Sequence, residues 1–277
     1  MSAKVGTPKS RGERAGLVAA GGALAAHVRA ATIVAALSLA ACSSAPGPRE
    51  STPRDNAANY NLQLGVAYLQ QGNLPVAKEK LERAEKQSPR DPHVHSALAL
   101  LYERLEKPAQ VDEHYRTAVR LAPDDPEINN NYAVYLCKTG RTEDGVKRFL
   151  QAARNPLYGT PAAAYTNAGV CLRNAKRFDE AQTNFIAALR ARPNFSEAAY
   201  QLGDLDLERG RPQNTRAQID SYMVTFAATP DLLLLGVRAA QAQGDRTAAE
   251  QYARRLRAEF PGSRQTRSLP DLLRNPG

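Results

Sequence analysis

The side chains best suited to catalysis or metal binding are scarce in this chain. Beyond residue 41 the histidines are His93, His95 and His114, which all fall within one expected helical hairpin. His93 and His95 are two residues apart and point to different sides of a helix, so we do not expect them to bind one metal ion together. The sequence has no CxxC motif, no Cys/His cluster and no glycine-rich phosphate loop. We therefore expect a protein that is not an enzyme, with no metal, no cofactor and no small-molecule substrate.

Cys42 is the cysteine whose surroundings predict a modification. Residues 30–41 are almost wholly apolar, with Arg29 before them and small residues just ahead of the cysteine. This is the layout of a secretory signal peptide, and roughly a dozen apolar residues are too few to span a bilayer. The segment Leu39-Ala40-Ala41-Cys42 resembles the bacterial lipobox, in which the cysteine thiol is acylated and becomes the new N-terminus. We expect removal of residues 1–41 and lipidation of Cys42; an apolar leader with a chance cysteine is the alternative.

The segment that follows predicts a tether. Residues 42–57 are rich in serine, proline and charge, with almost nothing to bury, which is typical of a flexible linker. Removing residues 1–41 would lower the net charge from +9 to about +5. Because the remaining charges of both signs are interleaved, we expect no nucleic-acid partner.

A repeat with a period near 34 residues dominates the chain from residue 58 to residue 261. Small residues, larger apolar residues and a late proline recur at fixed offsets, and this pattern resembles the tetratricopeptide repeat. The expected units are approximately 58–91, 92–125, 126–161, 162–195, 196–229 and 230–263, with a C-terminal tail over 262–277. Such hairpins bury a continuous core only when stacked, so we expect an all-α, right-handed superhelical solenoid. An irregular helical bundle is the alternative.

The first helix of each tetratricopeptide unit lines a concave groove. By this resemblance, the groove positions of the first three units are occupied by Asn59, Leu62, Val66, Leu69, Gln70, His93, Ser96, Leu100, Glu103, Arg104, Glu127, Asn130, Val134, Cys137 and Lys138. The candidate partner-binding residues among them are Asn59, Leu62, Val66, Leu69, Gln70, Leu100, Asn130 and Val134. We expect the apolar side chains among them to be exposed in the groove and not required for the core. Such a surface suits an extended segment or an amphipathic helix of a protein partner. Coverage by a second copy or by the chain's own tether is the alternative.

The two remaining cysteines form a candidate disulfide. Cys137 and Cys171 are an even pair in a chain expected to be exported. Both lie near the middle of first helices that should stack side by side, so a bridge between adjacent units is geometrically plausible. Two buried free thiols are the alternative.

The middle units carry a more specific resemblance. Asn129-Asn130-Asn131-Tyr132-Ala133 precedes Asn155-Pro156-Leu157-Tyr158 in a third unit that is two residues longer, and Asn167-Ala168-Gly169 follows in the fourth. This pattern resembles the type IV pilus biogenesis/stability lipoprotein family (PilF/PilW), in which glycine usually stands at the position of Ala133.

The resemblance implies the role of a pilotin. Such a lipoprotein is held in the outer membrane by its acyl chains and faces the periplasm, where it binds secretin subunits. It promotes their outer-membrane localisation and multimerisation, so that type IV pili and twitching motility are supported. Ser43 fits this destination, because Asp after the acylated cysteine typically signals retention in the inner membrane. A general scaffold lipoprotein for cell-wall enzymes or outer-membrane protein assembly, and a repeat protein that dimerises through its groove, remain alternatives.

Overall fold

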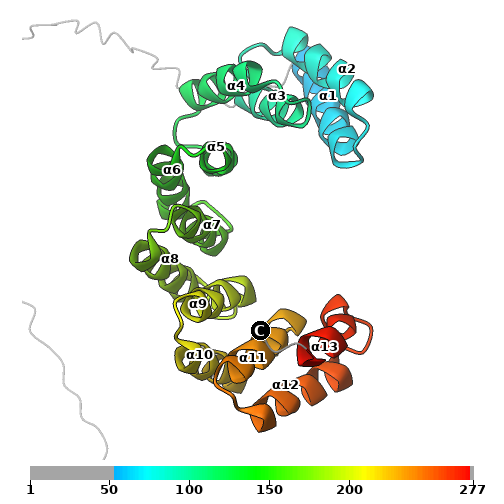
Figure 1. Ribbon diagram of the computed structural model, residues 1–277. Coiled ribbons are helices and arrows are strands. Elements are labelled where there is room, and N and C mark those ends of the chain that lie inside the picture. The colour runs from blue at the N-terminus through cyan, green and yellow to red at the C-terminus, as the bar shows by residue number, and fades with distance from the viewer. Residues whose placement is uncertain (1–52, 275–277) are drawn as a thin grey trace, which may run out of the picture. The chain divides into compact units, whose positions relative to one another are not determined.

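The computed structural model describes residues 53–274, which form thirteen helices and no strand within that range (Figure 1). Their bounds are α1 Pro53–Gln70, α2 Leu74–Gln87, α3 Pro92–Arg104, α4 Pro108–Leu121, α5 Pro126–Lys138, α6 Thr142–Arg154, α7 Pro161–Asn174, α8 Phe178–Ala191, α9 Ser196–Glu208, α10 Pro212–Thr225, α11 Pro230–Ala242, α12 Arg246–Glu259 and α13 Arg264–Arg274. The predicted signal peptide 1–41 and Cys42 lie outside the described residues. Within them, no helix combines the length and the apolar character that crossing a membrane requires.

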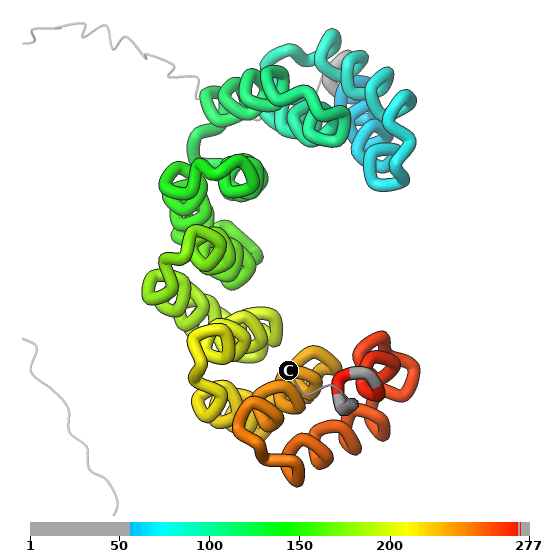
Figure 2. Tube along the Cα trace, viewed as in Figure 1, coloured from blue at the N-terminus to red at the C-terminus, as the bar shows by residue number. Residues whose placement is uncertain are grey.

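Consecutive helices pair into six hairpins, from α1–α2 to α11–α12, which stack in chain order (Figure 2). The first helices of neighbouring hairpins also contact each other, from α1 with α3 through α9 with α11. Figure 1 shows α5 and α7 on one side of the stack and α6 and α8 on the other. The all-α solenoid predicted from the repeat is confirmed.

Local sequence signals explain where the first helices begin. The first helices of units two to six, α3, α5, α7, α9 and α11, begin within one residue of the predicted units. The Asp91 carboxylate accepts a hydrogen bond from the His93 amide at 2.8 Å, and that of Asp125 accepts one from Ile128 at 2.9 Å. Proline follows each aspartate as the first helical residue, where its missing N–H and fixed φ cost nothing.

The turn inside each hairpin adopts the same left-handed backbone conformation. Positive φ angles occur at Gly72, Glu106, Gly140, Lys176, Gly210 and Gly244. These positions are 34 residues apart except for the step from Gly140 to Lys176, which is 36 because the third unit is longer. Four of the six are glycine, the residue that tolerates this conformation without steric cost.

The core alternates small residues with large ones along the stack. Phe185 on α8 is fully buried against Gly169 on α7, where an added Cβ would collide with the Phe185 ring. Ala133 on α5 is also fully buried and packs with Phe149. Close approach at the small residue therefore lets the large side chain fill the space between the two helices of a hairpin.

Both ends of the repeat array are longer than the sequence predicted. Helix α1 begins at Pro53, inside the predicted tether 42–57, and α13 occupies most of the predicted tail 262–277. Leu269 of α13 is fully buried in the cluster formed by α11 and α12, and Gln241 Nε2 donates a hydrogen bond to the Leu272 carbonyl at 2.9 Å. The tail therefore packs as a further helix on the last hairpin.

Candidate partner-binding groove

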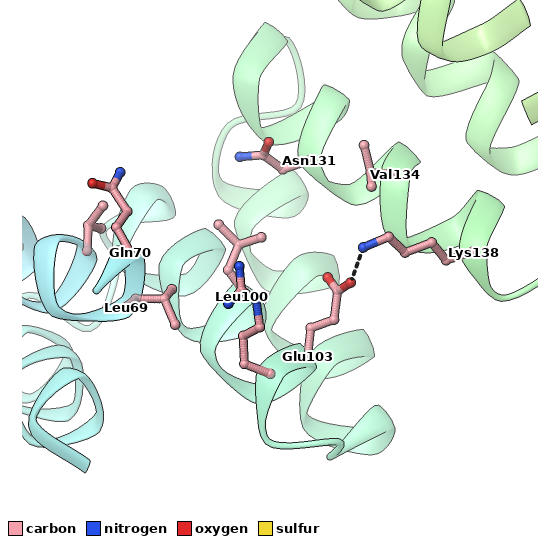
Figure 3. A pocket seen from close by; sticks show the side chains of 9 residues that line it. Leu69, Gln70, Leu100, Glu103, Asn131, Val134 and Lys138 are labelled. Carbon is pink, nitrogen blue, oxygen red and sulfur yellow. Dashed lines mark hydrogen bonds and ion pairs between the residues drawn. The ribbon is translucent and has the colours of Figure 1, made fainter. Parts of the chain in front are cut away.

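A pocket of about 260 Å³ lies where the first helices of the first three hairpins meet. Figure 3 shows side chains of α1, α3 and α5 converging on it. Its lining residues are Val66, Leu69, Gln70, Leu100, Glu103, Arg104, Asn131, Val134 and Lys138. We call this set the N-terminal groove. Val66, Leu100 and Val134, one from each helix, are half-buried and form its apolar floor.

Charged side chains border this floor. Lys138 Nζ on α5 lies 2.7 Å from Glu103 Oε1 on α3, and the ion pair spans two neighbouring hairpins (Figure 3). The Lys138 side chain is largely exposed, and Arg104 is exposed beside Glu103. An apolar floor with a charged rim can bind a segment that presents apolar side chains flanked by polar ones.

A second pocket of about 200 Å³ adjoins the first, with which it shares Val134 and Lys138. The disulfide between Cys137 on α5 and Cys171 on α7 forms part of its wall, with an S–S distance of 1.97 Å and Cα atoms 5.6 Å apart. Gly145 on α6 leaves room for it, since a Cβ there would collide with Cys137 Sγ. The first helices of the third and fourth hairpins are thus covalently joined beside the groove.

Farther along the stack, charged side chains on the first helices α7, α9 and α11 contact one another. Arg173 on α7 contacts Asp204 at 2.8 Å and Glu208 at 2.6 Å, both on α9. Arg238 on α11 reaches Asp204 at 3.0 Å. Hydrogen bonding to the Arg173 guanidinium holds the pKa of Glu208 below its usual value. The charged groups neutralise each other across three hairpins, so this part of the surface is less suited to an apolar segment.

The structure brings together five of the eight candidate partner-binding residues. Val66, Leu69, Gln70, Leu100 and Val134 line the N-terminal groove. Leu69 is only 7% exposed and belongs to the buried cluster with Leu81 and Leu98, so the expectation that the core does not need it is wrong.

The other three candidates lie outside the pocket. Leu62 packs half-buried against the core cluster of the first hairpin. Asn59 is exposed on α1, where its side-chain oxygen accepts a hydrogen bond from Gln63 at 3.4 Å. Asn130 accepts one from Asn167 on α7, also at 3.4 Å. These contacts place Asn130 at the junction of α5 and α7.

Sequence reasoning missed two features. Asn131 lines the groove although it lies one position beyond the groove position that Asn130 occupies. Glu85, His95 and His114 come together from α2, α3 and α4, with ligand atoms within 4.8 Å of one another. The cluster reflects a contact between different repeats, which no spacing within one repeat encodes.

Comparisons with known proteins agree with the fold. The tetratricopeptide repeat model matches residues 62–126 and 172–228, and a second model of the same description matches residues 232–263. The type IV pilus assembly protein PilF of Pseudomonas aeruginosa is 30% identical over 210 residues, which are 76% of this chain and 83% of the relative.

Two solved structures are similar over nearly their full length. The Pseudomonas aeruginosa PilF structure has a TM-score of 0.62 and 29% identity, and the match covers 79% of this chain and 99% of that one. The crystal structure of PilW, described as a widely conserved type IV pilus biogenesis factor, also has a TM-score of 0.62 and 29% identity, with 77% and 98% covered.

Proposed function

Because this chain belongs to the PilF/PilW family of type IV pilus tetratricopeptide-repeat proteins, we propose that it acts as a pilotin for secretin subunits. In this proposal Cys42 carries acyl chains in the outer membrane, and the repeats face the periplasm. The repeats bind a segment of the secretin and assist its localisation and multimerisation. The protein binds its partner and performs no chemistry on it.

The N-terminal groove is the observation that carries the proposal. Val66, Leu100 and Val134 expose apolar surface on three different helices, and this surface is continuous across one pocket. A segment of a partner that laid apolar side chains there would gain from their removal from water, at about 25 cal/mol per Å². The rim pair of Glu103 and Lys138 would fix the orientation of the segment through complementary charge.

The proposed anchor sets how far the groove can stand from the membrane. Lipid binding scales with the buried acyl chain, and stable anchoring requires more than one chain or a second signal. Ten residues separate Cys42 from Pro53, where α1 begins, and a chain of that length spans at most about 35 Å. Val66 lies thirteen residues farther along α1, which adds about 20 Å, so the anchor would hold a captured secretin segment within roughly 55 Å of the inner surface of the outer membrane.

The test is a charge placed on the groove floor. Val66→Glu and Val134→Glu should abolish capture of purified secretin subunits and reduce secretin multimers in the outer membrane. Val224→Glu is the matched control, because Val224 is 86% exposed on α10, away from the groove. Circular dichroism should show the same helicity in all three variants.

Other results would contradict the proposal. If the two groove variants captured secretin as the unmodified chain does, the groove assignment would fail. If a deletion strain kept its pili and secretin multimers while the protein copurified with cell-wall enzymes, the general scaffold role would replace the pilotin role. If the protein were recovered in the soluble fraction and carried no label after growth with radioactive palmitate, the proposed lipid anchor would be refuted.

A further inference from the structure

Three side chains with metal-binding atoms meet between the first and second hairpins. His95 Nδ1 on α3 lies 3.1 Å from His114 Nδ1 on α4. Glu85 Oε1 on α2 lies 3.7 Å from His95 Nδ1 and 4.0 Å from His114 Nδ1. His95 is 7% exposed, and Glu85 and His114 are half-buried, so the cluster is largely screened from solvent.

The hydrogen bond that His95 makes through Nε2 leaves a lone pair on its Nδ1, which faces His114 Nδ1 at 3.1 Å. The Pro89 carbonyl oxygen lies 2.9 Å from His95 Nε2 and accepts a hydrogen bond from it. In the neutral imidazole the proton is then on Nε2, and Nδ1 keeps its lone pair. Histidines that bind metals usually donate their other N–H to a carbonyl or carboxylate in this way.

The second histidine is also held in place. The His114 ring stacks on Tyr102, with ring centroids 5.3 Å apart and an angle of 16° between the planes. Tyr102 belongs to α3, the helix that carries His95, so both imidazoles are positioned by the same hairpin. Glu85 comes from the preceding hairpin and closes the third side of the cluster.

The three atoms have the separations that a small transition-metal ion requires. Given the three distances, a point about 2.1 Å from all of them exists in their plane, and zinc binds imidazole nitrogen and carboxylate oxygen at about that distance. We propose that Glu85, His95 and His114 form a binding site for a divalent transition metal, with Zn²⁺ as the representative ion. Two nitrogens and one carboxylate favour this class over Mg²⁺ or Ca²⁺, which prefer oxygen ligands.

The site has one side open to solvent. The Glu85 side chain is 34% exposed, so a water molecule can approach the ion as a further ligand. The bound metal would link α2 to α3 and α4 and so fix the first hairpin against the second. The first helices of these hairpins, α1 and α3, supply Val66 and Leu100 to the groove. The metal would therefore also fix the position of α1 relative to α3 in that groove.

Zinc titration of the full-length protein tests the site. The protein is purified without a histidine tag, freed of metal with a chelator and titrated with ZnCl₂ in a calorimeter. We expect one ion per chain and a higher melting temperature with zinc present. Glu85→Gln and His114→Gln should each weaken zinc binding at least ten-fold. The matched control is His93→Gln, because His93 is exposed on α3 and outside the cluster.

Two further measurements separate metal binding from a purely structural role of the same residues. X-ray absorption at the zinc edge should show two imidazole ligands in the wild-type protein. The metal-free variants should keep wild-type helicity, which shows that weaker binding does not reflect unfolding. The proposal is overturned if the wild-type chain takes up no stoichiometric zinc, if all three variants bind zinc equally, or if the absorption spectrum lacks imidazole. In those cases the histidines share only a hydrogen bond.

Discussion

Cys137 and Cys171 join α5 to α7 through a disulfide whose Cα atoms are 5.6 Å apart. The two helices belong to different hairpins, so the bond crosses the boundary between the third and fourth repeats. Elsewhere in residues 53–274 the hairpins are held to one another by packing, hydrogen bonds and ion pairs. The covalent link lies beside the pocket that extends the N-terminal groove.

Removing this bond should lower stability. The two cysteines are 34 residues apart in sequence, and the chain-entropy model gives about 3–4 kcal/mol for closing a loop of that size. Cys137→Ser with Cys171→Ser should therefore unfold at lower urea concentration than the oxidised wild type. A reductant should shift the wild type to the same extent and leave the double variant unchanged. Equal midpoints for oxidised wild type and variant would show that the bond contributes nothing.

Gly169→Ala should destabilise the fourth hairpin. The added Cβ would collide with the ring of the fully buried Phe185. Overpacking of this kind costs about 1–3 kcal/mol, measured as a lower free energy of unfolding in urea. Gly159→Ala is the control, because nothing lies within 4 Å of a Cβ there. Equal losses in both variants would contradict the packing argument.

The turn positions predict opposite effects for two substitutions. Glu106 adopts a φ of 55°, and Glu106→Gly should raise stability by roughly 0.5–1 kcal/mol, because relief of steric strain exceeds the added flexibility of the unfolded chain. Gly140→Ala places a side chain at a φ of 78° and should lower stability by about 1 kcal/mol. Thermal unfolding of the pair checks both signs. Changes in the same direction would refute the strain argument.

Glu208 should make stability depend on pH. Its hydrogen bond to Arg173 lowers its folded-state pKa below the ordinary value of 4.5. The resulting stabilisation is complete above the ordinary pKa and is lost as the pH falls through the lowered one. Glu208→Gln should therefore be less stable than wild type near neutral pH, by under about 1 kcal/mol because the pair is partly exposed. The difference should disappear in acid.

Glu127→Gln, at an exposed position, serves as the control. A stability difference between Glu208→Gln and wild type that persisted in acid would argue against the ion pair.

Much of the fold follows from the sequence because each repeat carries its own signals. Asp91 and Asp125 cap helices that begin with proline, and small residues such as Gly169 mark where helices cross. These signals act within one hairpin, so a 34-residue period locates them well. Val66 and Val134, which the same period assigns to groove positions, both line the N-terminal groove.

The remaining features depend on contacts that local signals do not encode. Pro270 lies inside α13, and proline in a helix interior argues against a helix, yet burial of Leu269 against α11 and α12 outweighs it. Leu69 lies at a groove position but is drawn into the core of the first two hairpins. The Glu85, His95 and His114 cluster joins two repeats, and its geometry becomes visible only when their packing is known.

Helix α13 has a consequence for self-association. In a stacked array each hairpin packs its apolar flank on the next one, so the flank of the last hairpin must be covered to keep the protein soluble. Here Leu269 and Leu272 already occupy that surface on α11 and α12. Helix α13 therefore covers the flank on which a hairpin of another molecule could stack, which disfavours end-to-end association through that flank.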